Sequence, residues 1–144
     1  MNEYDPNYIE VKNFYLIGVK TVVINSRNEV LLLRRSGLSP RPGDIDLPGG
    51  AVDAHESPEA AAIRETFEET GIVIDKAKII TSEYTGGHKD SWVMLGFSAH
   101  IDEAEVLLSW EHDEYKWVPI HEIQSSGLSD SYRNMIQSAS VGML

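Results

Sequence analysis

The segment from Ser57 to Gly71 most constrains the fold, because it specifies a helix with both ends marked. Ser57 is a favourable N-cap, Pro58 suits the first helical position, and Gly71 suits the left-handed position just past the last turn. The sequence therefore predicts a helix from about residue 58 to residue 70. At about 100° per residue, the arc expected to face a core contains Ala60, Ile63, Thr66, Phe67 and Thr70.

The opposite side of this predicted helix carries Glu65, Glu68 and Glu69. A solvated acidic face is the ordinary explanation of such a pattern. Here, however, Glu65 and Glu69 are like charges four residues apart, and Glu68 and Glu69 lie near the C-terminus, where the helix dipole disfavours anions. This placement indicates a bound cation. Three carboxylates favour Mg²⁺ or Mn²⁺ over a dedicated calcium cage.

Residues 36–50 separate the helix from the preceding segments and contain three prolines and four glycines. This density disfavours regular structure and predicts a long loop, and loops of this length inside a domain are usually functional. Gly49 and Gly50 end the loop beside the acidic helix. Backbone carbonyls exposed there can help to hold a cation, and a bulky side chain would obstruct a ligand.

The remaining chain shows strand patterns before and after the helix, with a second helix near the C-terminal end. Because strands and helices do not alternate strictly, the order favours an α+β fold with a mixed sheet packed between helices. Two pairs of strands, each with a polar or glycine-containing connection, are expected to form hairpins. The predicted strands are residues 14–24, 29–33, 72–84, 91–101 and 115–120, and the terminal helix is residues 130–138, capped by Ser129 or Asp130.

Composition limits the class of protein further. With 144 residues, 42% of them hydrophobic, we expect one domain over residues 1–144. The net charge of −11 disfavours stable binding to nucleic acid, and the lack of cysteine excludes thiolate metal sites and cysteine nucleophiles. The acidic first ten residues do not resemble a signal peptide, and no run is long enough to span a membrane. We therefore expect a cytoplasmic protein without membrane attachment.

The spacing around the helix resembles the Nudix box, the signature of the Nudix hydrolases. Gly50, Glu56 and the run RETFEETGI at residues 64–72 occupy all the invariant-type positions of that signature over 23 residues. The one departure is Thr66, where the family usually has an aliphatic residue, and it lies on the arc predicted to be buried. Residues 31–35 and 115–118 also look like the strands that flank the box in this family.

This resemblance implies an α/β/α sandwich with a mixed sheet. It also implies a hydrolase that directs water at a phosphorus atom and cleaves a phosphoanhydride bond, in a nucleoside diphosphate linked to another moiety or in a nucleoside triphosphate. The cofactor would be Mg²⁺ or Mn²⁺, with Glu65, Glu68, Glu69 and the Gly50 carbonyl as ligands and one of the glutamates also a base. Family members often add a glutamate from outside the box, for which Glu111 is the first candidate and Glu114 the second.

Substrate contacts are expected from arginines and aromatic residues. A guanidinium suits phosphate, and because neighbours on a strand point to opposite faces, only Arg34 or Arg35 should face the site, with Arg34 preferred. Glu56 and Arg64 are expected to form a structural salt bridge. Several aromatic side chains can stack on a base, although core packing is the default for each of them. They are Tyr84, Trp92, Trp110, Tyr115 and Trp117.

Two other functions are compatible with a Nudix-like fold. A binding module would sense a nucleotide without turnover, but such modules often lack metal ligands that this chain retains. An isomerase of isopentenyl diphosphate would use a catalytic cysteine, and this chain has none. The resemblance also makes a homodimer plausible, with a small nucleotide as the substrate.

Overall fold

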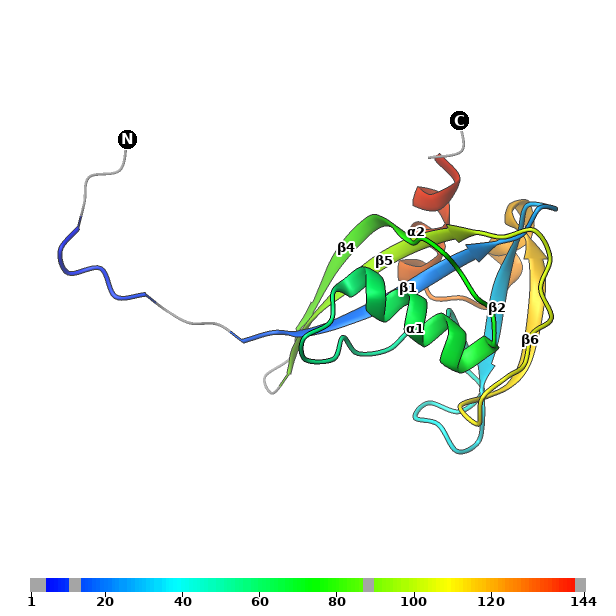
Figure 1. Ribbon diagram of the computed structural model, residues 1–144, viewed down its shortest axis with the longest axis horizontal. Coiled ribbons are helices and arrows are strands. Elements are labelled where there is room, and N and C mark those ends of the chain that lie inside the picture. Colours follow the sequence, from blue (N-terminus) through cyan, green and yellow to red (C-terminus); the bar gives the residue numbers. More distant parts are fainter. Residues whose placement is uncertain (1–4, 11–13, 87–89, 142–144) are drawn as a thin grey trace.

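A computed structural model of the chain describes residues 5–10, 14–86 and 90–141. Within these described residues, two α-helices, one short 3-10 helix and six strands follow one another (Figure 1). In order they are β1 (Leu16–Ile24), β2 (Glu29–Arg35), β3 (Ile45–Asp46), α1 (Pro58–Thr70), β4 (Lys78–Gly86), β5 (Ser91–His100), β6 (His112–Pro119), η1 (Ile120–Ser125) and α2 (Asp130–Val141).

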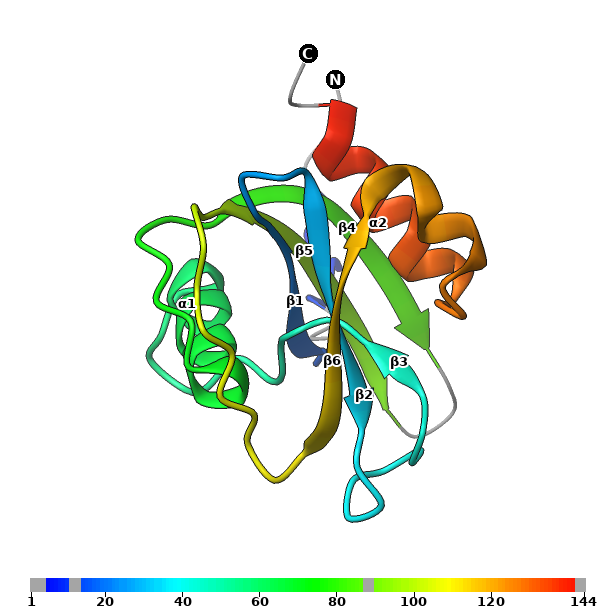
Figure 2. The same ribbon diagram turned by 90° about the vertical axis from the view of Figure 1, so that its right-hand side faces the viewer.

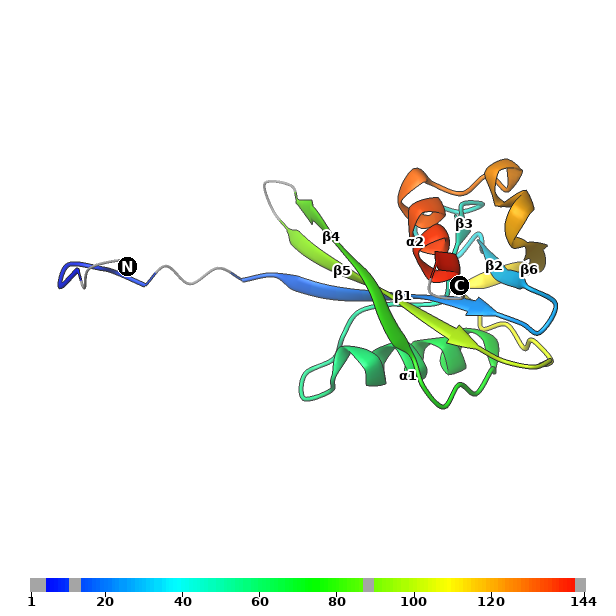
Figure 3. The same cartoon turned by 90° about the horizontal axis from the view of Figure 1, so that it is seen from above.

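The strands form one mixed sheet, as the sequence predicted. The order is β3-β2-β1-β5-β4, and β6 pairs with the other edge of β2. Strands β1 and β5 run parallel over their whole length, whereas the other pairs are antiparallel. Helix α1 covers one face, and α2 with η1 covers the other (Figures 2 and 3). The predicted α/β/α sandwich is therefore confirmed.

The second predicted hairpin is present as β4 and β5, whereas the first is reduced to one pair between β1 and β2, Ile24 with Val30. Strand β1 begins at Leu16 rather than Phe14, whose side chain is exposed. Residues 72–77 precede β4 without regular structure, and part of the turn between β4 and β5, residues 87–89, lies outside the described residues. Strand β6 begins at His112, earlier than expected. None of the helices in the described part of the chain has the length and apolar character needed to span a lipid bilayer.

The loop before α1 takes the place of a strand beside β1. Strands β1 and β2 pair only at Ile24 and Val30, and then they separate. Along the vacated edge, the N–H of Val19 donates to the Gly50 carbonyl at 2.8 Å, and the N–H of Thr21 donates to the Pro48 carbonyl at 2.8 Å. These bonds satisfy backbone groups that a bare sheet edge would leave unpaired. The segment predicted as a loop is thus fixed to the centre of the sheet.

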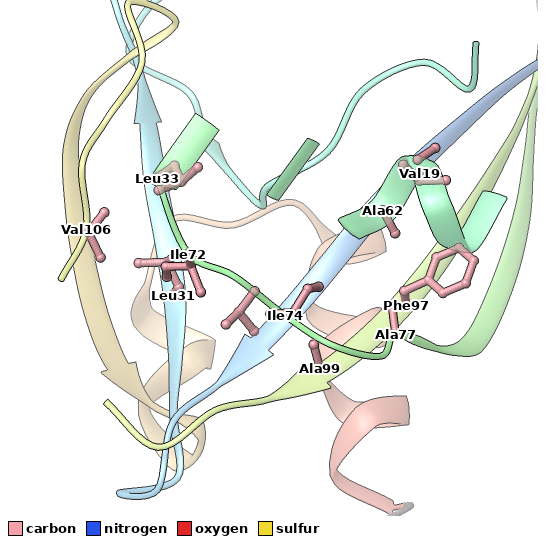
Figure 4. Packing of buried hydrophobic residues seen from close by; sticks show 12 residues of the cluster. Val19, Leu31, Leu33, Ala62, Ile72, Ile74, Ala77, Phe97, Ala99 and Val106 are labelled. Carbon is pink, nitrogen blue, oxygen red and sulfur yellow. The ribbon is translucent and has the colours of Figure 1, made fainter. Parts of the chain in front are cut away.

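Two apolar clusters hold the layers together, one on each face of the sheet. The cluster under α1 joins strand residues to small helix residues and to the chain after the helix (Figure 4). The cluster under α2 joins the alternate residues of β1 and β2 to the buried side of that helix. Members of the first include Val19, Leu31, Leu33, Ala62 and Ile72, and members of the second include Val22, Ile24, Leu32, Met135 and Ile136.

Helix α1 has the predicted ends but not the predicted buried face. Ser57 accepts a hydrogen bond from the Ala60 N–H, and Gly71 has φ of 70°. Thr66 and Thr70 are buried as expected, but Phe67 is 54% exposed and Ala60 is exposed. The helix instead buries Ala61, Ala62 and Glu69. Two consecutive alanines allow a close approach to the sheet, and Glu69 finds a hydrogen-bond partner there, which offsets part of the cost of burying it.

Substitution of Gly49 by alanine is expected to lower the free energy of unfolding by roughly 2–4 kcal/mol. Gly49 has φ of 147°, and an added Cβ would lie 2.0 Å from the Val19 carbonyl oxygen, which belongs to the sheet and cannot move away. Urea denaturation measures the loss. Gly37→Ala is the control, because that position has open space for a Cβ. Equal stability of the two variants would contradict the tight docking of the loop.

Candidate active site

Arg64 organises the acidic side of helix α1. Its guanidinium lies 2.6 Å from Glu56, which confirms the predicted salt bridge, and it also reaches Glu65 at 2.9 Å and Glu68 at 3.2 Å. It donates a further hydrogen bond to the Ala51 carbonyl at 3.1 Å. The hydrogen bond from Arg64 lowers the pKa of Glu56 and keeps that carboxylate ionised. Arg64 therefore ties the start of the box to the carboxylates of its last two turns.

Glu69 is the glutamate that departs most from a solvated acidic face. Its side chain is only 3% exposed, and its carboxylate accepts a hydrogen bond from the Gly49 N–H at 2.8 Å. Burial raises the pKa of Glu69 to about 8, against the opposing effect of the Lys20 charge. A buried carboxylate with so few donors is costly unless a cation or a proton compensates it.

Gly50 lies directly against Glu65. A Cβ at Gly50 would lie 2.5 Å from Oε1 of Glu65, so only glycine leaves this carboxylate its place. The Glu65 side chain is 15% exposed, and burial raises its pKa. The Gly50 carbonyl already accepts from Val19 and has a second lone pair available. The structure thus brings two of the predicted ligand residues into contact.

Glu111 is carried to the same place by the turn before β6. The carbonyls of Glu69 and Thr70 at the end of α1 accept from the N–H groups of Ser109 and Leu107, so the turn is bonded to the helix. The charge of Glu111 contributes to the raised pKa of both Glu65 and Glu69. Glu114 instead forms an ion pair with Arg34 on β2.

The chemistry of the donor set suits a hard divalent cation. Carboxylates and a backbone carbonyl are the ligands that Mg²⁺ and Mn²⁺ prefer, and the narrow space between Gly50 and Glu65 would be filled by any larger residue. Within the described residues, no three acidic or histidine side chains are yet close enough together to hold an ion. Glu65 and Glu68 are turned toward Arg64, and Glu69 is turned toward Gly49.

The two candidate arginines line different cavities, but both cavities lie on the face covered by η1 and α2, and Ile45 lines both. The expected alternation between opposite faces is interrupted, because the pairing of β2 with β6 is irregular between Arg34 and Arg35. Arg34 is half exposed, pairs with Asp113 and Glu114, and lines a cavity of about 460 Å³ on the side of η1. Arg35 is mostly buried, donates to Asp46 at 2.8 Å, and lines a cavity of about 980 Å³. Arg34, the arginine that the sequence analysis preferred, therefore lines the smaller of these two cavities.

The larger cavity lies between the sheet and the start of α2. Trp92 and Met94 on β5 form part of its wall, and Leu128 and Tyr132 close the side toward α2. Of the five aromatic candidates, Trp92 alone lines this cavity within the described residues. The others are placed elsewhere: Tyr84 stacks edge-on with Tyr15, Trp110 is exposed, Tyr115 lines the smaller cavity, and Trp117 packs on the core under α1.

Lys20 and Asp46 form a buried ion pair that the sequence reading missed. Their side chains lie 2.6 Å apart and are 7% and 2% exposed. The signal was present, because Lys20 is the one charged residue in the apolar run from residue 14 to residue 24. A lone charge within a buried strand is rare unless it is paired. His112 lies buried nearby, and burial lowers its pKa to about 4, which keeps its ring neutral.

Comparison with solved structures supports the same fold. A family model described as the NUDIX domain matches residues 15–139. The MutT protein of Methanosarcina mazei Go1 is 33% identical and superposes with a TM-score of 0.77, over 89% of this chain and 94% of that one. The NUDIX domain of Shewanella oneidensis NrtR, whose structure contains ADP ribose, superposes with a TM-score of 0.77 over 98% and 94% of the two chains. At 22% identity, that likeness concerns the fold alone.

Curated relatives match over parts of their length. The Nudix hydrolase YvcI of Bacillus subtilis is 31% identical over 117 residues, 77% of this chain and 71% of its own. A Mycobacterium tuberculosis protein provisionally named 8-oxo-dGTP diphosphatase 3 is 34% identical over 99 residues, covering 65% of this chain and 46% of its own. The ADP-ribose pyrophosphatase of Methanocaldococcus jannaschii is 38% identical over 68 residues, with 47% and 39% covered. The chain thus spans less than half of the last two.

Proposed function

Because this chain belongs to the Nudix family, we propose that it is a pyrophosphohydrolase that cleaves a phosphoanhydride bond of a nucleotide with the help of Mg²⁺ or Mn²⁺. The observation that carries the proposal is the contact of Gly50 with Glu65 beside the buried Glu69. This arrangement is costly for the protein alone and becomes favourable when a divalent cation is bound. The names of the relatives, an 8-oxo-dGTP diphosphatase and an ADP-ribose pyrophosphatase, point to nucleoside di- and triphosphate derivatives.

The proposed roles differ between the carboxylates on α1 and Glu111. Glu65, Glu68, Glu69 and the Gly50 carbonyl would hold the cation, which when bound neutralises phosphoryl charge and makes a bound water more acidic. To bind the cation, the carboxylates of Glu65 and Glu68 would give up their ion pairs with Arg64. Arg64 would remain paired with Glu56.

Glu111 is the proposed general base. The turn that carries it is bonded to the end of α1, its charge acts on Glu65 and Glu69, and no hydrogen bond within the described residues engages its carboxylate. It would accept a proton from water as the water oxygen bonds to phosphorus and the bond to the bridging oxygen breaks. The carbonyl of Glu111 accepts from Ser36 and Ser39, so the backbone that carries this base is fixed to the loop after β2.

The cavity of about 980 Å³ is the proposed place of the nucleoside. Asp46 in its wall begins the segment that leads to Gly49, whose N–H donates to Glu69. Asp46 does not read the base, because Lys20, Arg35 and the Leu47 N–H already occupy its two oxygens. Trp92, in the wall of this cavity, offers a ring on which the base can stack.

Replacement of Trp92 by alanine is expected to raise KM about tenfold with a smaller change in kcat. The ring supplies stacking of roughly 1–3 kcal/mol to a bound base, in the ground state and the transition state alike. Steady-state kinetics measure both constants. Trp110→Ala is the matched control, because that ring is 64% exposed and does not line the cavity. An unchanged KM for Trp92→Ala would exclude this cavity as the base site.

A substrate screen tests the proposal as a whole. Nucleotide sugars, dinucleoside polyphosphates, and nucleoside and deoxynucleoside triphosphates are each incubated with Mg²⁺, and released phosphate and pyrophosphate are measured. We expect release from at least one class, and its loss when the metal is chelated. Tight nucleotide binding without release from any class would favour the alternative, a nucleotide-sensing module without turnover.

A further inference from the structure

The buried lysine on β1 has more contacts than an ion pair with Asp46 requires. The ammonium of Lys20 lies 2.6 Å from Oδ1 of Asp46, 2.9 Å from the Leu47 carbonyl and 3.4 Å from the Gly49 carbonyl. An ammonium has three protons, and each is directed to a different acceptor. All three acceptors belong to the single segment that leads from β3 to Gly50.

The opposite side of this segment is held by Glu69. Its carboxylate accepts from the Gly49 N–H at 2.8 Å, while the Gly49 carbonyl faces Lys20. The neighbouring carbonyls of Pro48 and Gly50 accept from the N–H groups of Thr21 and Val19, the residues on either side of Lys20. Lys20 and the backbone of β1 therefore fix the backbone of Gly49 and Gly50 from the side of the sheet. Glu69 fixes it from the side of helix α1.

A pair of glycines cannot fix its own backbone direction, because glycine has access to many conformations of similar energy. The direction of the Gly50 carbonyl, and its distance from Glu65, thus depend on external anchors. Lys20 is the charged anchor on the side away from the helix. Groups that orient metal ligands in this way commonly change metal affinity by 10- to 100-fold when they are removed.

We infer that Lys20 is a positioning residue, which holds the Gly49–Gly50 backbone where Gly50 and Glu69 can bind the divalent cation together. This inference rests on the proposed metal-dependent function. It assigns Lys20 no contact with the substrate or with the cation. It also predicts that the charge pair with Asp46 is not the whole role of the lysine.

The test compares Lys20→Met with the double variant Lys20→Met/Asp46→Asn. Methionine fills a similar volume, and in the single variant Asp46 still has Arg35 as a partner. The double variant removes the carboxylate that lost its lysine, so it should recover stability in urea. We expect both variants to bind free Mn²⁺ at least about tenfold more weakly than the wild type, as measured by electron paramagnetic resonance of the protein without nucleotide. Lys116→Met, which removes an exposed lysine from β6, is the charge-matched control.

The activity readout separates positioning from a general loss of structure. For a substrate found in the screen, we expect a higher Mg²⁺ concentration for half-maximal rate and an unchanged nucleotide KM at saturating Mg²⁺. Recovery of both stability and Mn²⁺ affinity in the double variant would overturn the inference, since Lys20 would then serve only to neutralise Asp46. Absence of Mn²⁺ binding in the wild type would instead overturn the proposed function itself.

A measurement on the wild type covers the case in which neither variant folds. The Lys20 Nζ signal is followed by nitrogen NMR while Mg²⁺ is added. We expect the Lys20 signal to shift at saturating Mg²⁺, because a cation bound at Gly50 would change the environment of the neighbouring carbonyl groups that accept from Lys20. A signal that stays in place while the Glu65 and Glu69 carboxylates respond to the metal would overturn the inference.

Discussion

Replacement of Glu68 by glutamine is expected to reduce turnover by about a thousandfold while leaving the fold intact. The variant loses one of the carboxylates proposed to hold the cation, and metal-borne charge stabilisation is commonly worth several kcal/mol in the transition state. The fold should tolerate the change, because the Glu68 side chain is 56% exposed and Arg64 retains Glu56. We expect the free energy of unfolding to change by less than about 0.5 kcal/mol.

Glu59→Gln provides a control on the same helix. Glu59 lies in the first turn of α1, is exposed, and has no contact with Arg64. This variant removes the same charge from the same helix and should keep wild-type turnover. If Glu68→Gln retained full activity at limiting Mg²⁺, Glu68 could not be a ligand, and the cation would have to be held by Glu65 and Glu69 alone.

The contribution of Glu69 to the stability of the metal-free protein is expected to fall as the pH rises from about 4.5 to about 8. Burial of His112 has the opposite effect up to about pH 6.5, so the protein as a whole should lose stability mainly above that pH. In the unfolded chain Glu69 ionises near its ordinary pKa of 4.5, whereas burial in the folded protein raises the pKa to about 8. Between these values the folded state holds a proton that the unfolded state has lost. The contribution of Glu69 is therefore present in full below pH 4.5, and it is lost, by a few kcal/mol, as the pH approaches 8.

Urea denaturation across this pH range, with and without Mg²⁺, measures the effect. Glu69→Gln should lack this part of the slope, because glutamine does not titrate. Saturating Mg²⁺ should also remove it, since binding requires the ionised carboxylate and displaces close to one proton at pH 7. Calorimetry in two buffers of different ionisation enthalpy counts that proton. A metal-binding reaction that releases no proton would show that Glu69 is already ionised, or is not a ligand.

The ends of helix α1 and the composition of its acidic side could be predicted, because both depend on local chemistry. Ser57 and Gly71 act within one turn of the backbone, and their preferences hold in almost any fold. The pairing of Glu56 with Arg64 was also predicted, since Glu56 comes just before the helix and Arg64 lies within it. For the capping residues, the property that appears in the sequence is also the property that ends the helix.

The rotation of α1 could not be predicted from apolar spacing. A hydrophobic arc favours burying Phe67, yet the sheet requires a close approach, which Ala61 and Ala62 permit. The Glu69 side chain faces inward because its carboxylate accepts a hydrogen bond from the Gly49 N–H. That donor comes from a loop twenty residues earlier in the chain. Long-range partners of this kind have no local signature.

The cavity beside Trp92 lay beyond sequence reading for a related reason. Its walls come from β5, the loop before β3 and the start of α2, and no spacing rule connects these segments. Lys20 was the exception, since a lone ammonium in an apolar strand calls for a partner. The sequence could show that a partner had to exist, but only the packing of residues 46–49 against β1 identifies it.

Because residues 48–51 lie along β1 like a short strand, the position of the Gly50 carbonyl is set by the central sheet. The exposed residues 40–44 of the same connection do not hold the Gly50 carbonyl. Changes in the length or side chains of residues 40–44 would therefore alter the rim of the proposed nucleoside cavity without moving the Gly50 carbonyl. Diversity of substrates and constancy of reaction can thus coexist in a single connection.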